Sequence, residues 1–128
     1  FLKNIGLDYE HGTGHGVGFF SNVHEGPHSI SKYNDVKIHE GMIVSNEPGY
    51  YKKGRFGIRI ENLLYVENVR KKLKFENLTL APIDKDLIDF KQLDNNEKNY
   101  LFNYHLNIYS KLSKYLNNSE KRWLASFI

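Results

Sequence analysis

The sequence predicts an α+β fold, with strand patterns in its first part and a helix pattern in its last part. Residues 42–47 and 56–66 are rich in β-branched and aromatic residues, and Pro48-Gly49 ends the first of these runs. The Lys52-Lys53-Gly54 run between them has the composition of a turn. A further short strand is expected within residues 75–82.

A long amphipathic helix is predicted after Asp94. Asp94 and Glu97 have the spacing of a capping box. Apolar residues then recur at steps of three and four, which indicates one face turned to a core or a partner: Leu101, Tyr104, Ile108, Leu112 and either Tyr115 or Leu116. We expect Asn117-Asn118 to end this helix and 119–128 to form a tail with apolar cover for Trp123, and we expect His105 to be a surface or packing residue.

Composition limits the class of protein. The 128 residues, 40% of them hydrophobic, suffice for one core and are too few for two. Because there is no cysteine, a metal must bind through His, Asp and Glu.

The net charge of +3 is concentrated in residues 52–55 and 70–74, which we interpret as solvated turns rather than as a nucleic-acid face. No apolar run approaches the ~20 residues of a membrane span, and no signal peptide opens the chain. We therefore expect a soluble, cytoplasmic protein with neither nucleic acid nor membrane as a partner.

Glycine alternates with other residues in the segment His11–Gly18, which also holds two histidines. This spacing matches neither the G-x-G-x-x-G dinucleotide motif nor a phosphate loop. Because glycine loses much conformational freedom on folding, four at alternate positions predict unusual torsions or the close approach of a bound group, such as a metal or a substrate. The alternative is a flexible turn with two solvated histidines.

The string His24-Glu-Gly-Pro-His28 imitates the H-E-x-x-H motif of zinc proteases. That motif works on a helix, which places both histidines on one face. Pro27 removes a backbone donor and disfavours helical torsions at Gly26. We therefore expect His24 and His28 to diverge, with His28 as a polar loop residue.

Two glutamates stand where an unpaired charge is costly. Glu47 precedes Pro48 at a strand end, and Glu61 lies in an otherwise apolar strand. Arg59 alone compensates one of them, whereas a metal holds both. The alternative is an ion pair between Glu61 and Arg59, with Glu47 exposed at a turn. Adding His15 gives a nitrogen and oxygen ligand set that suits Mn, Co, Fe or Zn.

Four motifs in this order resemble the pita-bread metallopeptidases: His11-Gly-Thr-Gly-His15-Gly-Val-Gly, Asn22-Val-His24-Glu-Gly-Pro27, Gly41-Met-Ile-Val-Ser-Asn-Glu47-Pro-Gly-Tyr-Tyr51 and Gly57-Ile-Arg-Ile-Glu61-Asn62. Prolidase and methionine aminopeptidase share the ligand types. The Glu-Pro-Gly-Tyr-Tyr run, with residues 78–82 and 103–105, is most similar to the larger, eukaryotic-type aminopeptidase P family. The resemblance covers nearly the whole chain and implies the pita-bread (creatinase/aminopeptidase) fold, a curved antiparallel sheet with flanking helices.

The resemblance also implies two divalent metal ions, most often Mn²⁺, with Zn²⁺ or Co²⁺ as alternatives. His15, Glu47 and Glu61 match three of the family's five ligands, with Glu61 bridging the two cations and Glu47 also the candidate general base. The implied activity is metal-assisted hydrolysis that releases the N-terminal residue from peptides with proline in the second position.

Three further residues receive roles from the resemblance. His11 and His24 match residues that contact the substrate or the oxyanion. Arg59 matches a residue that orients the carboxylate ligands.

The family's other two ligands are aspartates upstream of the glycine segment, and Asp8 matches neither. We therefore expect the chain to be the C-terminal part of a catalytic domain and its fold to be incomplete, with a metal-site sheet region over residues 1–82 and a helical extension over 83–128. The implied partners are an upstream fragment with the two aspartates and a second copy in a homodimer. A non-catalytic pita-bread binding protein and a creatinase-type hydrolase stay open as alternatives.

Overall fold

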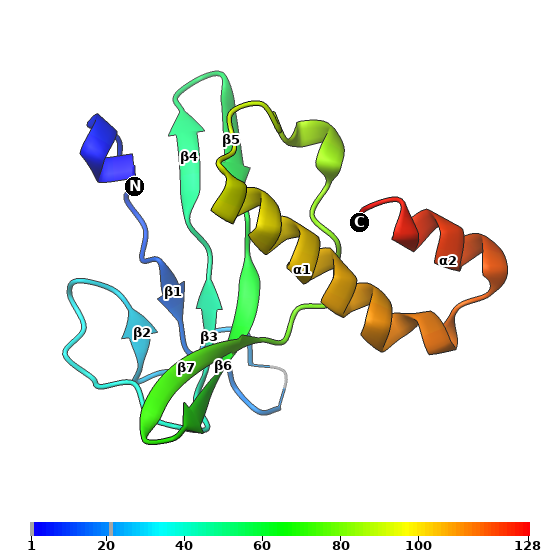
Figure 1. Cartoon of the computed structure of the whole chain (residues 1–128). Helices are drawn as coiled ribbons and strands as arrows, with labels where there is room; N and C mark the ends of the chain where they lie inside the picture. Colours follow the sequence, from blue (N-terminus) through cyan, green and yellow to red (C-terminus); the bar gives the residue numbers. More distant parts are fainter. Residues whose placement is uncertain (1, 21) are drawn as a thin grey trace. The chain divides into compact units, whose positions relative to one another are not determined.

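The computed structural model describes residues 2–20 and 22–128 and divides the chain into two compact units, Phe1–Thr79 and Leu80–Ile128. The first unit contains a short 3-10 helix, Leu2–Ile5, and seven strands (Figure 1). The strands are β1 (Gly14–His15), β2 (Ser29–Ile30), β3 (Ile43–Asn46), β4 (Gly49–Lys52), β5 (Phe56–Arg59), β6 (Asn62–Val69) and β7 (Lys72–Asn77).

All the strand pairs of the first unit are antiparallel. β3, β6 and β7 form one sheet in the order β3-β6-β7, β4 pairs with β5, and β1 pairs with β2. A bridge between Gly16 and Val44 joins the β1 segment to β3. The glycine segment therefore lies along the edge of the strand that leads to Glu47.

The expected continuous strand over residues 56–66 is wrong, because Ile60 and Glu61 separate β5 from β6. The break lies opposite a second break, at Glu47-Pro48 between β3 and β4. Pro48 has no backbone N–H to donate, so it interrupts the ladder. Asn46 faces Asn62 on one side of the break and Gly49 faces Arg59 on the other, which places Glu47 opposite Glu61.

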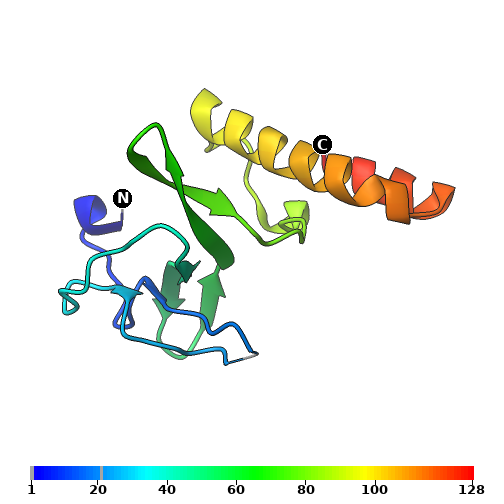
Figure 2. The same cartoon turned by 90° about the horizontal axis from the view of Figure 1, so that it is seen from below.

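The β6–β7 hairpin turns at Arg70 and Lys71, both of which have positive φ, at 52° and 66°. This is the backbone of a two-residue turn whose twist suits a hairpin. The strand expected within residues 75–82 is β7, which begins at Lys72 and ends at Asn77, so residues 78–82 lie outside it. The basic run is therefore a turn only in part, since Lys72 and Lys74 lie on the exposed strand β7, which Figure 2 shows twisting with β6. Lysines on such a strand discourage pairing with another chain.

The glycines at 14 and 16 make room for the protein's own backbone, not for a bound group or an unusual torsion. A Cβ at Gly14 would overlap the carbonyl of Ser45, and one at Gly16 would overlap the carbonyl of Glu25. The described glycines with positive φ lie elsewhere, at 6, 41 and 54. At these two positions the expectation is thus corrected, because strand packing and not a ligand supplies the close approach.

The second unit holds two helices, α1 (Asn95–Leu112) and α2 (Asn118–Ala125), with short 3-10 turns at Lys85–Leu87 and Ser113–Tyr115. The predicted capping box of Asp94 and Glu97 is present at the start of α1. The predicted end of this helix is wrong: α1 stops at Leu112, and Asn117 begins α2 with a capping box of its own to Glu120. Asn117 accepts two backbone N–H bonds of the new helix, and so starts a helix where a tail was expected.

The core of the second unit is apolar. Tyr104, Ile108 and Leu124 are buried together, with partly buried side chains packed around them: Leu80, Ile83, Tyr109, Leu112 and Leu116. His105 is also buried, and its Nε2 accepts the N–H of Ile83 at 3.1 Å, so it is a packing residue. Burial lowers the pKa of His105 below its ordinary value.

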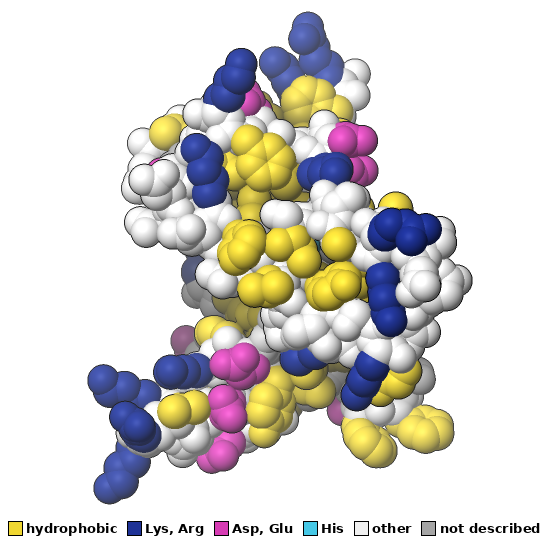
Figure 3. All heavy atoms as spheres, turned by 45° about the vertical axis from the view of Figure 1, so that its right-hand side comes forward, with side chains coloured by type: hydrophobic (Ala, Val, Ile, Leu, Met, Phe, Trp, Pro, Cys, Tyr) yellow, Lys and Arg dark blue, Asp and Glu magenta, His cyan; other side chains and the backbone are white. Residues whose placement is uncertain are grey.

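Trp123 is 59% exposed and packs edge-on against Phe127, with 5.1 Å between ring centroids. The face in Figure 3 carries apolar side chains among small groups of Lys and Arg, without a single basic field. None of the described helices combines the length and the apolar character that crossing a membrane requires.

Candidate metal centre

Alternation along two paired segments gathers polar side chains on one face. Residues at every second position of the 45–51 segment share a face, and those of the 57–61 segment opposite share the same face. This face carries Ser45, Glu47, Gly49 and Tyr51 on one segment and Gly57, Arg59 and Glu61 on the other.

Glu47 is 9% exposed and each of its carboxylate oxygens has a partner. Its Oε1 accepts the hydroxyl of Ser45 at 3.0 Å, and its Oε2 lies 3.4 Å from an Arg59 terminal nitrogen. The alternative with Glu47 exposed at a turn is therefore wrong. Glu61, expected in an apolar strand, is instead exposed, because the strand breaks there.

His15 is oriented through its backbone and through one ring nitrogen. Its N–H donates to the Ser45 hydroxyl at 2.9 Å, and its Nδ1 lies 2.9 Å from the carbonyl of Gly16. A carbonyl only accepts, so Nδ1 carries the proton, and Nε2 turns toward Glu47 Oε1 at 3.2 Å. This is how a histidine is arranged when Nε2 serves as a metal ligand and the other nitrogen is fixed by a hydrogen bond.

The donor atoms of His15, Glu47 and Glu61 all lie within 4.8 Å of one another. Two carboxylates placed opposite each other on paired strands repel unless a cation neutralises them. Arg59 contacts Glu47 within ion-pair distance, but it is shared between two partners because its Nε donates to Tyr51. A nitrogen and two carboxylates suit Mn²⁺, Co²⁺, Fe²⁺ or Zn²⁺, so the residues present fit a divalent cation.

Tyr51 is a further residue of this face, and its sequence motif alone predicts no role for it. Its ring lies over two glycines: a Cβ at Gly57 would stand 2.7 Å from its Cδ1, and one at Gly49 would overlap its hydroxyl end. The strand period that places it on the face of Glu47 is the signal that could have identified it.

The Tyr51 hydroxyl connects His11 to Arg59. Nδ1 of His11 lies 2.7 Å from the Gly12 carbonyl, so it carries the proton, and Nε2 accepts the Tyr51 O–H at 2.7 Å. The same hydroxyl oxygen accepts Arg59 Nε–H at 2.9 Å. This hydrogen bond, followed by the charges of Glu47 and Glu61, raises the pKa of Arg59 above its ordinary value. His11 thereby belongs to the same polar network as Glu47.

The two histidines of the false zinc-protease motif do diverge, and residues 24–28 are not helical. His24 is exposed, and its ring centroid is 4.1 Å from that of His15, beside the donor group. His28 turns the other way, and its Nε2 donates to the carbonyl of Ile43 at 3.0 Å. The structure thus brings His24 to the site and uses His28 to hold β3.

Comparison with known proteins identifies the class. Residues 1–68 match the metallopeptidase family M24, and residues 71–126 match the C-terminal region of peptidase M24. The chain belongs to metallopeptidase family M24, and its fold is the pita-bread fold of that family.

Two curated relatives carry the same activity name. A probable Xaa-Pro aminopeptidase P from Pyrenophora teres f. teres is 48% identical, with 90% of this chain and 19% of that protein covered. One from Laccaria bicolor is 47% identical, with 96% of this chain and 21% of that protein covered. The chain therefore spans about a fifth of the length of these curated relatives.

A solved structure matches nearly the whole chain. X-prolyl aminopeptidase from Caenorhabditis elegans, described as a cytosolic enzyme with a di-nuclear active site, is 39% identical with a TM-score of 0.85. The match covers 98% of this chain and 22% of that one.

Proposed function

We propose that this chain is part of a metal-dependent aminopeptidase that releases the N-terminal residue from peptides with proline in the second position. The observation that carries the proposal is the convergence of the His15, Glu47 and Glu61 donor atoms within 4.8 Å. The names of the similar proteins supply the substrate class.

His15, Glu47 and Glu61 would hold divalent cations together with two aspartates from outside these 128 residues. Bound divalent cations would activate a water molecule for attack on the peptide carbonyl and stabilise the negative charge that develops on it. Manganese as the metal, two cations rather than one, a homodimer and a cytoplasmic location are further parts of this proposal.

Glu47 accepts the proton of the attacking water. Ser45 and Arg59 each engage one of its oxygens, so the carboxylate is held in one rotamer without loss of its charge. Arg59 is a positioning residue in this proposal, because it acts through Glu47 and Tyr51.

His24 and His11 contact the peptide. His24 is exposed beside His15 and is placed to donate to the carbonyl oxygen that becomes negative. His11 lies at the other end of the network, where its position is set by Tyr51.

The experiment compares His24→Ala with His39→Ala in the polypeptide that carries this chain; His39 is an exposed histidine that no step of the proposal uses. We expect His24→Ala to lower the turnover of an Ala-Pro peptide about 100–1,000-fold, as for the loss of one oxyanion donor, with metal content unchanged, and His39→Ala to change neither. Equal loss of metal and activity would make His24 a ligand instead. Mn²⁺, Zn²⁺ and Co²⁺ are added in separate assays, and native mass measurement tests the homodimer.

Two further outcomes bear on the alternatives. Cleavage of creatine-like substrates rather than peptides would favour the creatinase-type hydrolase, and cation binding without any hydrolysis would favour the binding protein. Residues 1–128 alone should be inactive, because three ligands cannot hold two cations. Activity of these residues alone equal to that of the longer polypeptide would contradict the five-ligand site.

A further inference from the structure

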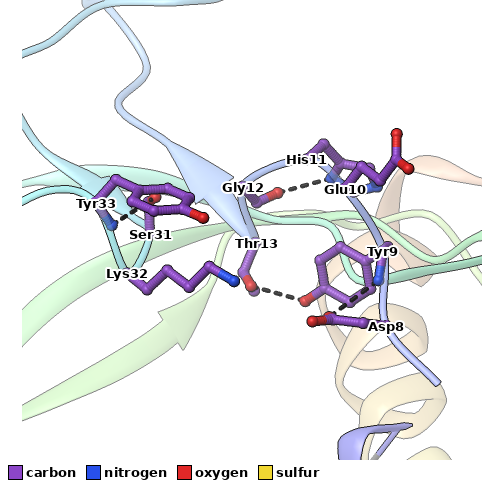
Figure 4. Close-up of a pocket in the computed structure, with 9 residues that line it drawn as sticks. All are labelled: Asp8, Tyr9, Glu10, His11, Gly12, Thr13, Ser31, Lys32 and Tyr33. Carbon is purple, nitrogen blue, oxygen red and sulfur yellow. Dashed lines mark hydrogen bonds between the residues drawn. The ribbon is translucent and has the colours of Figure 1, made fainter. Parts of the chain in front are cut away.

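A cavity of about 580 Å³ lies beside the metal centre, within the first unit (Figure 4). Its volume falls within the range typical of ligand pockets. It is lined by residues of two segments, 8–13 and 31–33. Tyr9 and Tyr33 stand on opposite sides of the Gly12-Thr13 backbone in Figure 4.

The cavity is connected to the site through His11. The His11 ring packs against Tyr9, with 4.7 Å between centroids, while its Nε2 accepts the Tyr51 hydroxyl. Tyr51 in turn accepts from Arg59, which contacts Glu47. His11 therefore belongs both to the lining of the cavity and to the network that holds Glu47.

The rims of the cavity are held by local hydrogen bonds. The Tyr9 hydroxyl is 2.7 Å from the Thr13 hydroxyl, and the Tyr33 N–H donates to Ser31 Oγ at 3.2 Å. Thr13 N–H donates to the Ile30 carbonyl at 2.9 Å, which joins the two lining segments. The cavity is thus a feature of the β1–β2 pair and not a gap between separate units.

Lys32 brings a positive charge to this cavity, whose lining also includes Asp8 and Glu10 on the other segment. Its ammonium lies 5.2 Å from the centroid of the Tyr33 ring and ends beside Thr13 in Figure 4. Among the described residues, the structure records no carboxylate in ion-pair contact with Lys32. A cation on an aromatic wall and without a carboxylate partner is suited to pair with an anionic ligand group.

The orientation of a bound peptide decides which of its anionic groups can pair with Lys32. An aminopeptidase accommodates a single residue on the amino side of the bond it cleaves, so a peptide that extends past His11 does so with its carboxyl side. We propose that this cavity is a subsite for the residues that follow the proline, and that Lys32 pairs there with the C-terminal carboxylate of a short peptide. This inference rests on the proposed function.

The test uses Ala-Pro peptides extended by one to four alanines, each with a free C-terminal carboxylate and as the C-terminal amide. In the unsubstituted protein, at the length that brings the carboxylate to Lys32, the free acid should have a KM about three- to fivefold below that of the amide, the size expected of an exposed ion pair. Lys32→Ala should remove this difference by raising KM of the acid, with kcat unchanged. Lys37→Ala is the matched control, because Lys37 is an exposed lysine of the same loop and does not line the cavity.

The same acid-to-amide ratio in Lys32→Ala and in the unsubstituted protein, at every length, would overturn the proposal. So would a preference for peptides with Lys or Arg at those positions, which would assign the cavity to Asp8 and Glu10 instead.

A binding measurement separates this proposal from the proposed function. Pro-Ala-Ala, the product of such a cleavage, is titrated calorimetrically as free acid and as amide. If no Ala-Pro peptide is cleaved, the proposed function fails, while tighter binding of the acid that depends on Lys32 still supports the subsite. Equal binding of acid and amide overturns it.

Discussion

The two units of this chain bury different kinds of side chain. Unit Phe1–Thr79 buries Ser45 and Glu47 beside Val44 and Val66, whereas unit Leu80–Ile128 buries the apolar set Tyr104, Ile108 and Leu124 with a single polar side chain among its described residues, His105. These two polar groups of the first unit are buried with partners: Ser45 accepts the N–H of His15 and donates to Glu47 two residues further along, and Arg59 contacts Glu47 from the opposite segment. We interpret the polar interior of the first unit as serving the proposed chemistry and the mainly apolar interior of the second as serving stability.

The sharpest way to test this comparison is to remove one ligand. Glu47→Gln should lower the affinity for Mn²⁺ by more than about a hundredfold, because loss of a group that only supports a ligand already costs 10–100-fold. Titration calorimetry measures it, with Glu76→Gln on exposed strand β7 as the matched control. Unchanged affinity in Glu47→Gln would remove Glu47 from the centre.

A cavity made in the apolar core should lower the stability of the second unit and leave the affinity for Mn²⁺ unchanged. Ile108→Ala truncates a side chain with 0% exposure and should cost about 2–5 kcal/mol of unfolding free energy in the second unit. Hydrogen exchange of the α1 amides measures it, and Leu106→Ala, which is 42% exposed on the same helix, should cost much less. If Mn²⁺ affinity falls as steeply as amide protection, the division of roles between the units is wrong.

The next prediction concerns the contact between the Tyr51 ring and Gly57. Tyr51→Phe removes the hydroxyl that joins His11 to Arg59, and Gly57→Ala displaces the ring that carries it. Each should lower kcat on an Ala-Pro peptide about tenfold. The double variant should lose little more than either alone, since both act on one contact.

Tyr50→Phe is the control for this pair, because the Tyr50 ring faces Phe56 instead, with 5.9 Å between centroids. Fully multiplicative losses in the double variant would show that Gly57 and Tyr51 act separately.

The smallest expected effect is a pH dependence confined to the second unit. Burial lowers the pKa of His105 in the folded state, so the unfolded state binds the proton more readily. The stability that depends on neutral His105 is present above the ordinary histidine pKa of about 6.5 and is lost as pH falls below it. For one proton the slope cannot exceed about 1.4 kcal/mol per pH unit.

Amide exchange of α1 between pH 7 and pH 5 measures this dependence. It should be absent in His105→Asn and retained in His39→Asn, which changes an exposed histidine. A dependence that survives in His105→Asn would assign the titration to another group.

Local features of the chain were predictable from the sequence because their causes lie within a few residues. The capping box of Asp94 and Glu97 and the turn at Gly54, with its φ of 70°, belong to this class. The interruption of the false zinc-protease motif by Pro27 also acts locally. The second capping box, at Asn117 and Glu120, is equally local, but the prediction is wrong there because Asn also commonly ends a helix.

The site depended on sequence for its residues and on tertiary structure for its geometry. Ligand types and motif order predicted His15, Glu47 and Glu61 as the candidate ligands. Their donor atoms lie within 4.8 Å of one another because the strand register places Glu47 opposite Glu61 and the Gly16–Val44 bridge holds the β1 segment beside β3. Cross-strand register relates residues that are distant in the chain, so a single sequence does not reveal it.

The same reason explains what the glycines do and where Tyr51 lies. The sequence predicted either unusual torsions or the close approach of a bound group at the alternating glycines, and only the fold decided that at Gly14 and Gly16 the carbonyls of Ser45 and Glu25 are what approach. Likewise the hydroxyl of Tyr51 reaches His11 because Gly57 stands beside it on the neighbouring strand. The sequence determines which chemical groups are present, whereas pairing between strands distant in the chain sets the distances between those groups.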